Sequence, residues 1–326
     1  MNYPWVTFEN GNYTVKLNLL NGTKIRETED DFFNPTTIES MDIKITNCCD
    51  GPGGALCKFC HEDSRPDGKH ADLFAPSFLD NLHPYTELAI GGGNPLSHPH
   101  LLQFLIKCKE RKHIPNMTVN QYHFKQNFNF IKQLIDCKLI YGLGISVSYF
   151  PDHEFCAMVK EIPNAVLHII AGLDNSTDRY LRFFRDEGIK KILILGYKQV
   201  RRGEKYYEGM APGFETNICL LKKNLPTILE EGWFEVVSFD NLALQQLSVK
   251  SMIDEDTYNE IFMGDDGLTG EMNSASMYAD LVERKYAKNS CSMERFDLKD
   301  TVEEMYMHLR NKEFYEDLYA EQIEQM

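Results

Sequence analysis

The sequence lacks features that would place it in several common classes of protein. It has no uninterrupted apolar run of about 18 residues, so we expect no membrane-spanning helix. Its first residues do not follow the basic-then-apolar order of a secretory signal peptide. Lys and Arg number 34 against 49 Asp and Glu, and the formal net charge of −15 argues against a polymeric nucleic acid as partner.

The cysteine content excludes a further class. Nine cysteines are an odd number, and 326 residues are many for a small secreted domain, so we expect no disulfide framework. The 43% of hydrophobic residues argues against disorder. These counts favour a protein of a reducing compartment, and we expect it in the cytoplasm, with cysteines that bind metal, react or pack.

Three parts follow one another along the chain. Residues 1–40 predict a β-hairpin region, with type I′ turns at Asn10-Gly11 and Asn21-Gly22. Its expected strands are 5–9, 12–20 and 23–27. Residues 41–240 alternate short apolar runs with amphipathic segments. Residues 241–326 predict an α+β extension that covers the mouth of the central part, and the stretch just before and into it, 233–247, is expected to be mostly β.

The central part has the rhythm of an α/β fold. Nearly continuous apolar runs are typical of parallel strands covered on both faces. The expected strands are 42–47, 87–91, 117–120, 144–148, 166–171 and 191–196. The expected helices are 100–111, 127–137, 153–161, 177–187 and 217–231. Six such units predict a partial (β/α)6 parallel barrel, with a doubly wound sheet as the alternative. In the extension we expect a turn at 265–267, a strand within 274–282 and a helix over 301–325.

A cysteine cluster follows the first strand of the central part. Cys48 and Cys49 come directly after it, and a loop with Gly51, Gly53 and Gly54 leads to Cys57 and Cys60. The glycines allow the loop to fold back, so Cys49 can join Cys57 and Cys60 around one metal centre. A thiol redox pair and a structural zinc site completed by His61 or His70 are the alternatives. We expect four other cysteines to be buried packing residues: Cys108, Cys137, Cys156 and Cys219.

A glycine-rich segment follows the second strand of the central part. Gly91, Gly92 and Gly93 expose backbone groups to a ligand, and Asn94 and Pro95 come next. The segment is not a phosphate-binding loop or a dinucleotide fingerprint, because the required spacings are absent. Three glycines by themselves favour a tight turn.

Together these motifs resemble the radical S-adenosylmethionine (radical SAM) superfamily. The resemblance rests on Cys57-Lys58-Phe59-Cys60, on the Gly-Gly-Asn-Pro segment where the family often has Gly-Gly-Glu-Pro, and on the β/α rhythm from 41 to about 240. Two departures stand out. Seven residues separate Cys49 from Cys57 where the family usually has three, and Asn94 replaces the charged glutamate.

The resemblance implies a [4Fe–4S] cluster on Cys49, Cys57 and Cys60, with Cys48 as the less favoured first ligand. It also implies SAM as the second cofactor and a flavodoxin- or ferredoxin-like electron donor. Cleavage of SAM would give a 5′-deoxyadenosyl radical that takes hydrogen from a substrate. The implied cofactor-binding residues are Phe59, Gly91, Gly92, Gly93, Asn94, Pro95, Asn120, Ser146, Ser148 and Ala171.

The substrate is less defined. A peptide or protein side chain is favoured, and a nucleotide or small metabolite is the second choice. A non-catalytic, zinc-stabilised binding protein is the alternative from another class. The basic and aromatic stretch 198–207 could hold a substrate carboxylate or phosphate, or be a solvated loop. Asp265, Asp266 and Glu271 could face a basic peptide. Cys291 is the candidate catalytic residue, as a hydrogen donor, and no auxiliary cluster is expected.

Overall fold

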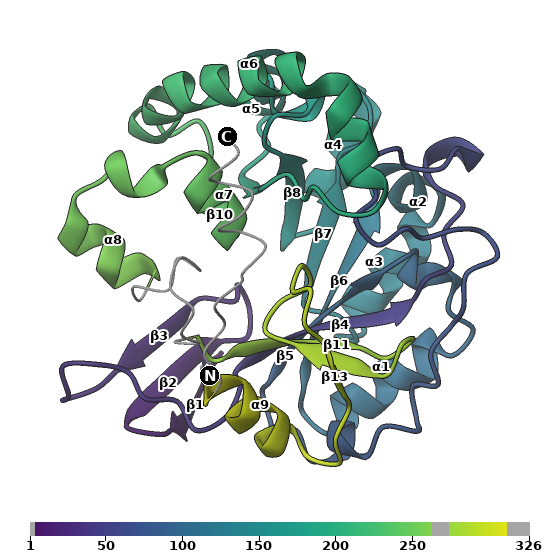
Figure 1. Cartoon of the computed structure of the whole chain (residues 1–326), viewed down its shortest axis with the longest axis vertical. Helices are drawn as coiled ribbons and strands as arrows, with labels where there is room; N and C mark the ends of the chain where they lie inside the picture. The colour runs from purple at the N-terminus through teal and green to yellow at the C-terminus, as the bar shows by residue number, and fades with distance from the viewer. Residues whose placement is uncertain (1–3, 263–273, 312–326) are drawn as a thin grey trace.

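Two β-sheets organise the chain. The computed structural model describes residues 4–262 and 274–311 (Figure 1). A three-stranded antiparallel sheet contains β1 (Trp5–Asn10), β2 (Tyr13–Asn18) and β3 (Lys24–Glu27), which confirms the three N-terminal strands. The prediction of type I′ turns was wrong. A type I′ turn needs a positive φ angle at both of its central residues, and in each of these turns only the glycine has one, Gly11 at 65° and Gly22 at 78°.

The second sheet has ten strands, seven of which lie in chain order. Each of these seven is parallel to its neighbour. They are β4 (Ser40–Thr46), β5 (Glu87–Gly92), β6 (Ile114–Asn120), β7 (Gly142–Ser146), β8 (Ala165–Ile170), β9 (Lys191–Leu195) and β10 (Val236–Phe239). The six predicted strands of the central part are therefore present in a large parallel sheet.

The C-terminal extension continues this sheet on the other side of β4. Strand β11 (Ser276–Asp280) runs parallel to β4, and β12 (Lys285–Ala287) and β13 (Phe296–Asp297) follow in antiparallel pairs. In the described residues β10 and β11 are not hydrogen-bonded to each other. Because β4 to β10 lie in consecutive order, each connection adds the next strand on the same side of the one before it. A barrel has this order, whereas a doubly wound sheet grows from its centre in two opposite directions. Closure into a partial barrel stays a prediction.

Helices cover one face of the large sheet. In Figure 1 α1 to α6 form an arc around the sheet from lower right to top. They are α1 (Leu101–Glu110), α2 (Gln121–Gln126), α3 (Phe128–Asp136), α4 (His153–Lys160), α5 (Asp178–Asp186) and α6 (Arg202–Glu230). Three more belong to later segments: α7 (Asn241–Gln246), α8 (Glu255–Phe262) and α9 (Val302–Arg310).

Two expectations about these elements need correction, and a third group lies outside the described residues. Helix α6 begins at Arg202, not at 217, and passes through Pro212. Proline disfavours a helix locally, but buried Phe214, Ile218 and Leu221 dock this one on the sheet. The stretch 233–247 is strand only at β10, because Asp240 accepts a hydrogen bond from the Ala243 N–H and begins α7. The turn at 265–267, the acidic residues Asp265, Asp266 and Glu271, and the helix beyond 311 lie outside the described residues.

The two faces of the large sheet differ in burial. Residues such as Met41, Ile43 and Leu88 are fully buried under the helices. Alternate residues on the other face, such as Asp42 and Ala89, are exposed. The expectation that both faces are covered by apolar packing was therefore wrong. The strands have period-two patterns, and the second face opens to solvent.

Candidate functional site

The open face of the parallel sheet is polar. Strand register places side chains from β4 to β10 side by side on it. Its polar members are Asp42, Lys44, Asn116, Thr118, Asn120, Ser146, His168 and Ser238. Polar side chains on the inner face of such a sheet, near the carboxyl ends of its strands, are typical of a ligand site. We call this surface the inner face.

Glycines on the inner face make room for larger side chains. A Cβ on Gly142 would lie 2.7 Å from Asn116 Oδ1, and a Cβ on Gly144 would lie 2.3 Å from His168 Cε1. Burial lowers the pKa of His168 to about 4, so its imidazole is neutral at pH 7. His168 escaped the sequence analysis, although its place in an alternating strand, between Leu167 and Ile169, was a usable signal.

The cysteine loop brings three of the predicted ligands together. Burial, with the nearby thiols of Cys60 and Cys49, raises the pKa of Cys57 to about 12. Burial also raises the pKa of Cys49, and Cys60 and Cys48 add to it. Cys48 differs, because its Sγ donates to the Pro66 carbonyl at 3.1 Å. Cys49 as the first ligand stays a prediction, and a metal bound by these thiols would have to displace their protons.

Backbone hydrogen bonds fix the start of this loop. The chain returns beside the end of β4, where the Asn47 N–H donates to Lys69 O and the Cys49 N–H donates to Arg65 O, each at 2.8 Å. Gly68 fits this crossing because a Cβ would lie 2.0 Å from Asn47 O. The Gly51 N–H points at Cys49 Sγ at 3.4 Å. A backbone donor of this kind stabilises an anionic sulfur.

The glycine segment after β5 packs directly on the cysteine loop. The Gly93 N–H donates to Thr46 O and the Asn94 N–H donates to Cys48 O, both at 2.7 Å. A Cβ on Gly93 would lie 2.3 Å from Cys48 O, and one on Gly92 would lie 2.4 Å from Thr46 O. Gly91 has nothing within 4 Å of its would-be Cβ. Gly92 and Gly93 therefore allow the glycine segment to pack closely on the start of the cysteine loop, whereas Gly91 borders open space.

Asn94 is partly engaged within its own segment. Its side-chain oxygen accepts from the Leu96 N–H at 3.2 Å, and its backbone carbonyl accepts from Ser97 Oγ at 2.7 Å. Pro95 is buried behind it. The amide nitrogen of the side chain makes no hydrogen bond within the described residues.

The remaining predicted cofactor residues lie farther along the sheet edge. The Asn120 side-chain amide donates to Ser148 Oγ, and the register places Ser146 beside Asn120. Ser148 lies two residues beyond β7, held by its N–H on Gln121 Oε1 at 3.1 Å. Ala171 is fully buried and donates to Leu195 O at 2.8 Å. The structure thus joins Asn120, Ser146 and Ser148.

Histidines near the cysteines bear on the zinc alternative. His70 Nδ1 lies 2.8 Å from Thr46 Oγ1, and His61 Nε2 lies 3.4 Å from Glu62 Oε1. A different residue, His123, lies close to the cluster. Ligand atoms of Cys49, Asp50 and His123 are all within 4.8 Å of one another, and His123 Nε2 is 2.7 Å from Asp50 Oδ1. This pair fastens the cysteine loop to α2.

The basic stretch 198–207 packs on the cysteine loop and is not simply a solvated loop. Arg201 Nη1 donates to His61 O at 2.7 Å, and Arg202 Nη2 donates to Ser64 O at 2.6 Å. The ring of Tyr206 lies 5.9 Å from that of Phe59. From Arg202 onward the stretch is the first turns of α6.

Lys198 turns the other way, toward the extension and the inner face. Its Nζ donates to Ser290 Oγ at 3.1 Å. Its pKa is raised, since burial, which would lower it, is outweighed by Cys291, Asp240 and Asp42. The surrounding protein withdraws both carboxyls from bulk water and so raises the pKa of Asp42 and Asp240, although Asp42 keeps exposed surface on the inner face. No carboxylate of the described residues lies within 4.0 Å of Lys198 Nζ. Asp42 and Asp240 also escaped the sequence analysis.

Cys291 is buried beside this group. Its Sγ lies 4.0 Å from Ser290 Oγ, and its N–H donates to Asn289 Oδ1 at 2.9 Å. Of the four cysteines expected to pack, Cys108 and Cys156 are buried, but Cys137 and Cys219 are exposed, so that expectation was half wrong.

A buried ion network ties the cysteine loop to the extension. Lys44 Nζ lies 2.7 Å from Glu62 Oε2 and 3.2 Å from Asp280 Oδ2, and all three side chains are at most 6% exposed. Asp280 also meets Arg295 Nη1 at 3.4 Å. Strands β4 and β11 and the cysteine loop are thereby held in one arrangement.

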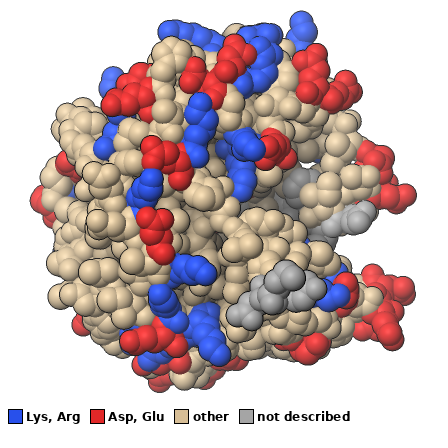
Figure 2. Space-filling model, turned by 180° about the vertical axis from the view of Figure 1, so that it is seen from behind, with Lys and Arg blue, Asp and Glu red and all other residues tan. Residues whose placement is uncertain are grey.

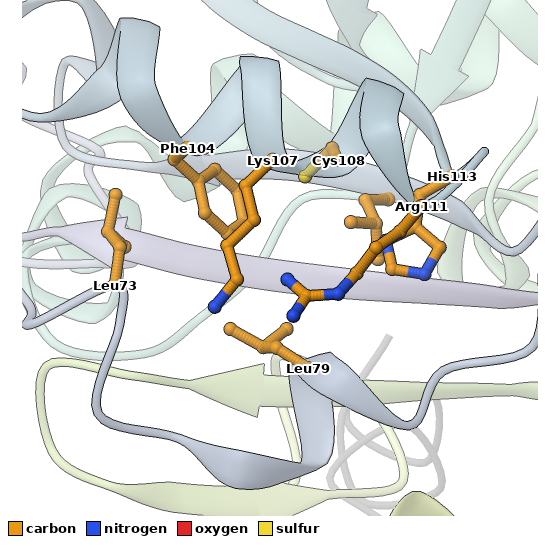
Figure 3. Close-up of a pocket in the computed structure, with 8 residues that line it drawn as sticks. Leu73, Leu79, Phe104, Lys107, Cys108, Arg111 and His113 are labelled. Carbon is orange, nitrogen blue, oxygen red and sulfur yellow. The ribbon is translucent and has the colours of Figure 1, made fainter.

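The space between α1 and the sheet is small. A cavity of about 10 Å³ lies below α1, lined by Leu79, Phe104 and Cys108 (Figure 3). Lys107 and Arg111 extend past it, and each meets Asp80 Oδ1 at 2.8 Å. This space holds at most one water.

The surface charge and the apolarity of the helices bear on which partners the protein can bind. On the face seen in Figure 2, Lys and Arg side chains alternate with Asp and Glu instead of forming a continuous basic surface. None of the described helices combines the length and apolarity that crossing a membrane requires.

Comparison with known proteins finds similarity in structure alone. No protein-family model matches the sequence, and no curated protein matches it. Crystal structures of Streptococcus suis SuiB are similar. SuiB bound to S-adenosylmethionine has a TM-score of 0.58 at 11% identity, over 94% of this chain and 87% of that one. SuiB bound to precursor peptide SuiA has a TM-score of 0.60 at 11% identity, over 99% and 90%. This chain shares the SuiB fold.

Proposed function

We propose that the protein is a radical SAM enzyme acting on a peptide or protein side chain. One observation carries the proposal. The thiols of Cys49, Cys57 and Cys60 gather beside the glycine segment, at the carboxyl end of β4 and β5, in a fold shared with SuiB. The sequence resemblance implies both cofactors, and the SuiB structure with bound S-adenosylmethionine supports SAM as one of them.

The donor set fits a [4Fe–4S] cluster. Three half-buried thiols on one loop leave a fourth position open, and the Gly51 N–H already points at Cys49 Sγ. When bound, such a cluster supplies the electron that cleaves the sulfonium of SAM. Cys49, Cys57 and Cys60 would hold it, and Gly91 borders the open space beside it.

The chain's own residues would bind and orient the cofactor and substrate. Asn120, Ser146 and Ser148 offer a polar edge for the ribose of SAM. Lys198, Asp42 and Asp240 face the inner side with unfilled hydrogen-bonding capacity and would hold the substrate's polar groups. Cys291 lies at the same place and is our candidate hydrogen donor. The extension, residues 241–326, would cover this mouth and exclude water.

The peptide substrate is supported by the SuiB structure with bound precursor peptide. A nucleotide or small metabolite is the second candidate, since the inner face is polar enough for either. A flavodoxin- or ferredoxin-like protein would be the electron donor.

Anaerobic purification followed by reduction with dithionite tests the enzyme. We expect iron and sulfide in the protein and 5′-deoxyadenosine from SAM, both lost in Cys57→Ala and kept in Cys156→Ala, whose thiol is buried outside the loop. Peptide substrates should raise 5′-deoxyadenosine and change in mass, while nucleotides should not. Protein that binds zinc, without iron or sulfide, would instead establish the zinc-stabilised binding protein, which the Cys49, Asp50 and His123 group favours.

A further inference from the structure

Arg202 carries a charge that the protein leaves incompletely satisfied. Its Nη2 donates to Ser64 O at 2.6 Å. Its Nε lies 3.0 Å from Asp63 Oδ1, but the two atoms are not aligned as a hydrogen bond. Nη1 is buried and has no hydrogen-bond acceptor among the described residues, and Nε has only this ion contact with Asp63. A buried guanidinium with unused donors is costly unless something anionic completes it.

The place of Arg202 suggests what completes it. Arg202 contacts the cysteine loop at Asp63 and Ser64, three and four residues beyond Cys60. The first turn of α6 rests on the same loop, because a Cβ on Gly203 would lie 3.6 Å from Phe59 O and the Tyr206 ring packs on Phe59, which lies between Cys57 and Cys60 in the sequence. The guanidinium is therefore held on the loop that carries the thiols expected to hold the cluster.

We infer that Arg202 is a positioning residue and the counter-charge of the cluster held by Cys49, Cys57 and Cys60. This inference rests on the proposed function. Three thiolates bring negative charge to a half-buried place, and one-electron reduction adds one more charge with no bond made or broken. A guanidinium held on the cysteine loop stabilises the reduced form more than the oxidised form, so it raises the reduction potential.

The neighbouring Arg201 provides a matched control. It also donates to the cysteine loop, through His61 O at 2.7 Å, and meets Glu62 at 3.6 Å. Its side chain is 40% exposed, against 20% for Arg202, so solvent screens its charge more. A variant of Arg201 therefore removes a loop contact without removing the proposed counter-charge.

The experiment uses anaerobically purified full-length protein and measures iron and sulfide content, thermal melting, and the midpoint potential by dithionite titration followed by electron paramagnetic resonance. The variants are Arg202→Gln, Arg202→Lys and Arg201→Gln. We expect Arg202→Gln to have a lower midpoint potential than wild type. Arg202→Lys should keep most of the potential, and Arg201→Gln should keep all of it.

The outcomes separate this inference from the function on which it rests. A potential unchanged in Arg202→Gln overturns the inference, as does an equal loss of iron in all three variants, which would show general support of the loop. Loss of iron in Arg202→Gln alone, with melting preserved, supports it, because the charge is then needed to hold the cluster. If the wild-type protein contains no iron and sulfide, the proposed function itself is contradicted.

Discussion

The ion network around Lys44 gives the most direct test of how the cysteine loop is held. Replacing Lys44 by Met leaves the carboxylates of Glu62 and Asp280 buried without their shared ammonium. Breaking a buried ion pair by removing one partner costs about 3–5 kcal/mol. Asp280 keeps Arg295 at 3.4 Å and Glu62 keeps Arg201 at 3.6 Å. We therefore expect the lower end, about 3 kcal/mol.

That loss can be read as a change in melting temperature. With an unfolding entropy of about 2.1 cal/mol/K per residue, about 3 kcal/mol lowers the melting temperature of a chain this long by about 4–5 °C. Differential scanning calorimetry measures it. We also expect Lys44→Met to lower iron content, because Glu62 follows Cys60 by two residues.

Lys16→Met is the matched control. Lys16 lies 2.6 Å from Glu27, but the two side chains are 40% and 55% exposed, so its loss should cost about 0–1 kcal/mol. Adding Glu62→Gln to Lys44→Met should restore part of the stability by removing one uncompensated charge. The reasoning is refuted if Lys44→Met melts no lower than Lys16→Met.

Two further predictions follow from packing and charge. Gly93→Ala places a Cβ 2.3 Å from Cys48 O, so calorimetry should show a loss of about 3 kcal/mol, whereas exposed Gly209→Ala, with nothing within 4 Å, should not destabilise. Burial alone would raise the pKa of Glu39, but Arg26 and Lys24 lower it below its usual value, so its contribution to stability is present above pH 4.5 and is lost as pH falls through the lower folded pKa. Glu39→Gln should lose stability at pH 7 and show a weaker acid dependence of melting than wild type, and equal acid dependence would contradict this assignment.

Local patterns predicted most of the elements. The strands at β4 to β9 and the helices α1, α3, α4 and α5 all lie within a few residues of their predicted ranges. Their periodicity is a property of neighbouring residues, so the sequence carries it directly. The start of α6 was missed because Pro212 weakens the local helical pattern, and only packing on the sheet overrides it.

Some residues of the candidate site could also be predicted from local patterns, and others could not. Two residues separate Cys57 from Cys60, and this spacing predicted that they bind one metal centre together. The choice between Cys48 and Cys49 could not be predicted from spacing, because it depends on which thiol turns toward Pro66 O. Asp42, His168 and Asp240 were missed because the burial of alternate strand positions is decided by what covers the sheet.

The sequence by itself determined an α/β chain with a cysteine loop and a glycine segment after its first two parallel strands. Only the tertiary structure decided that Gly92 and Gly93 press these loops together, that Arg201 and Arg202 hold the cysteine loop from α6, and that Lys198 points to the inner face. The reason is physical. Spacing and periodicity act over a few residues, but these contacts join residues that are 45 to 140 positions apart.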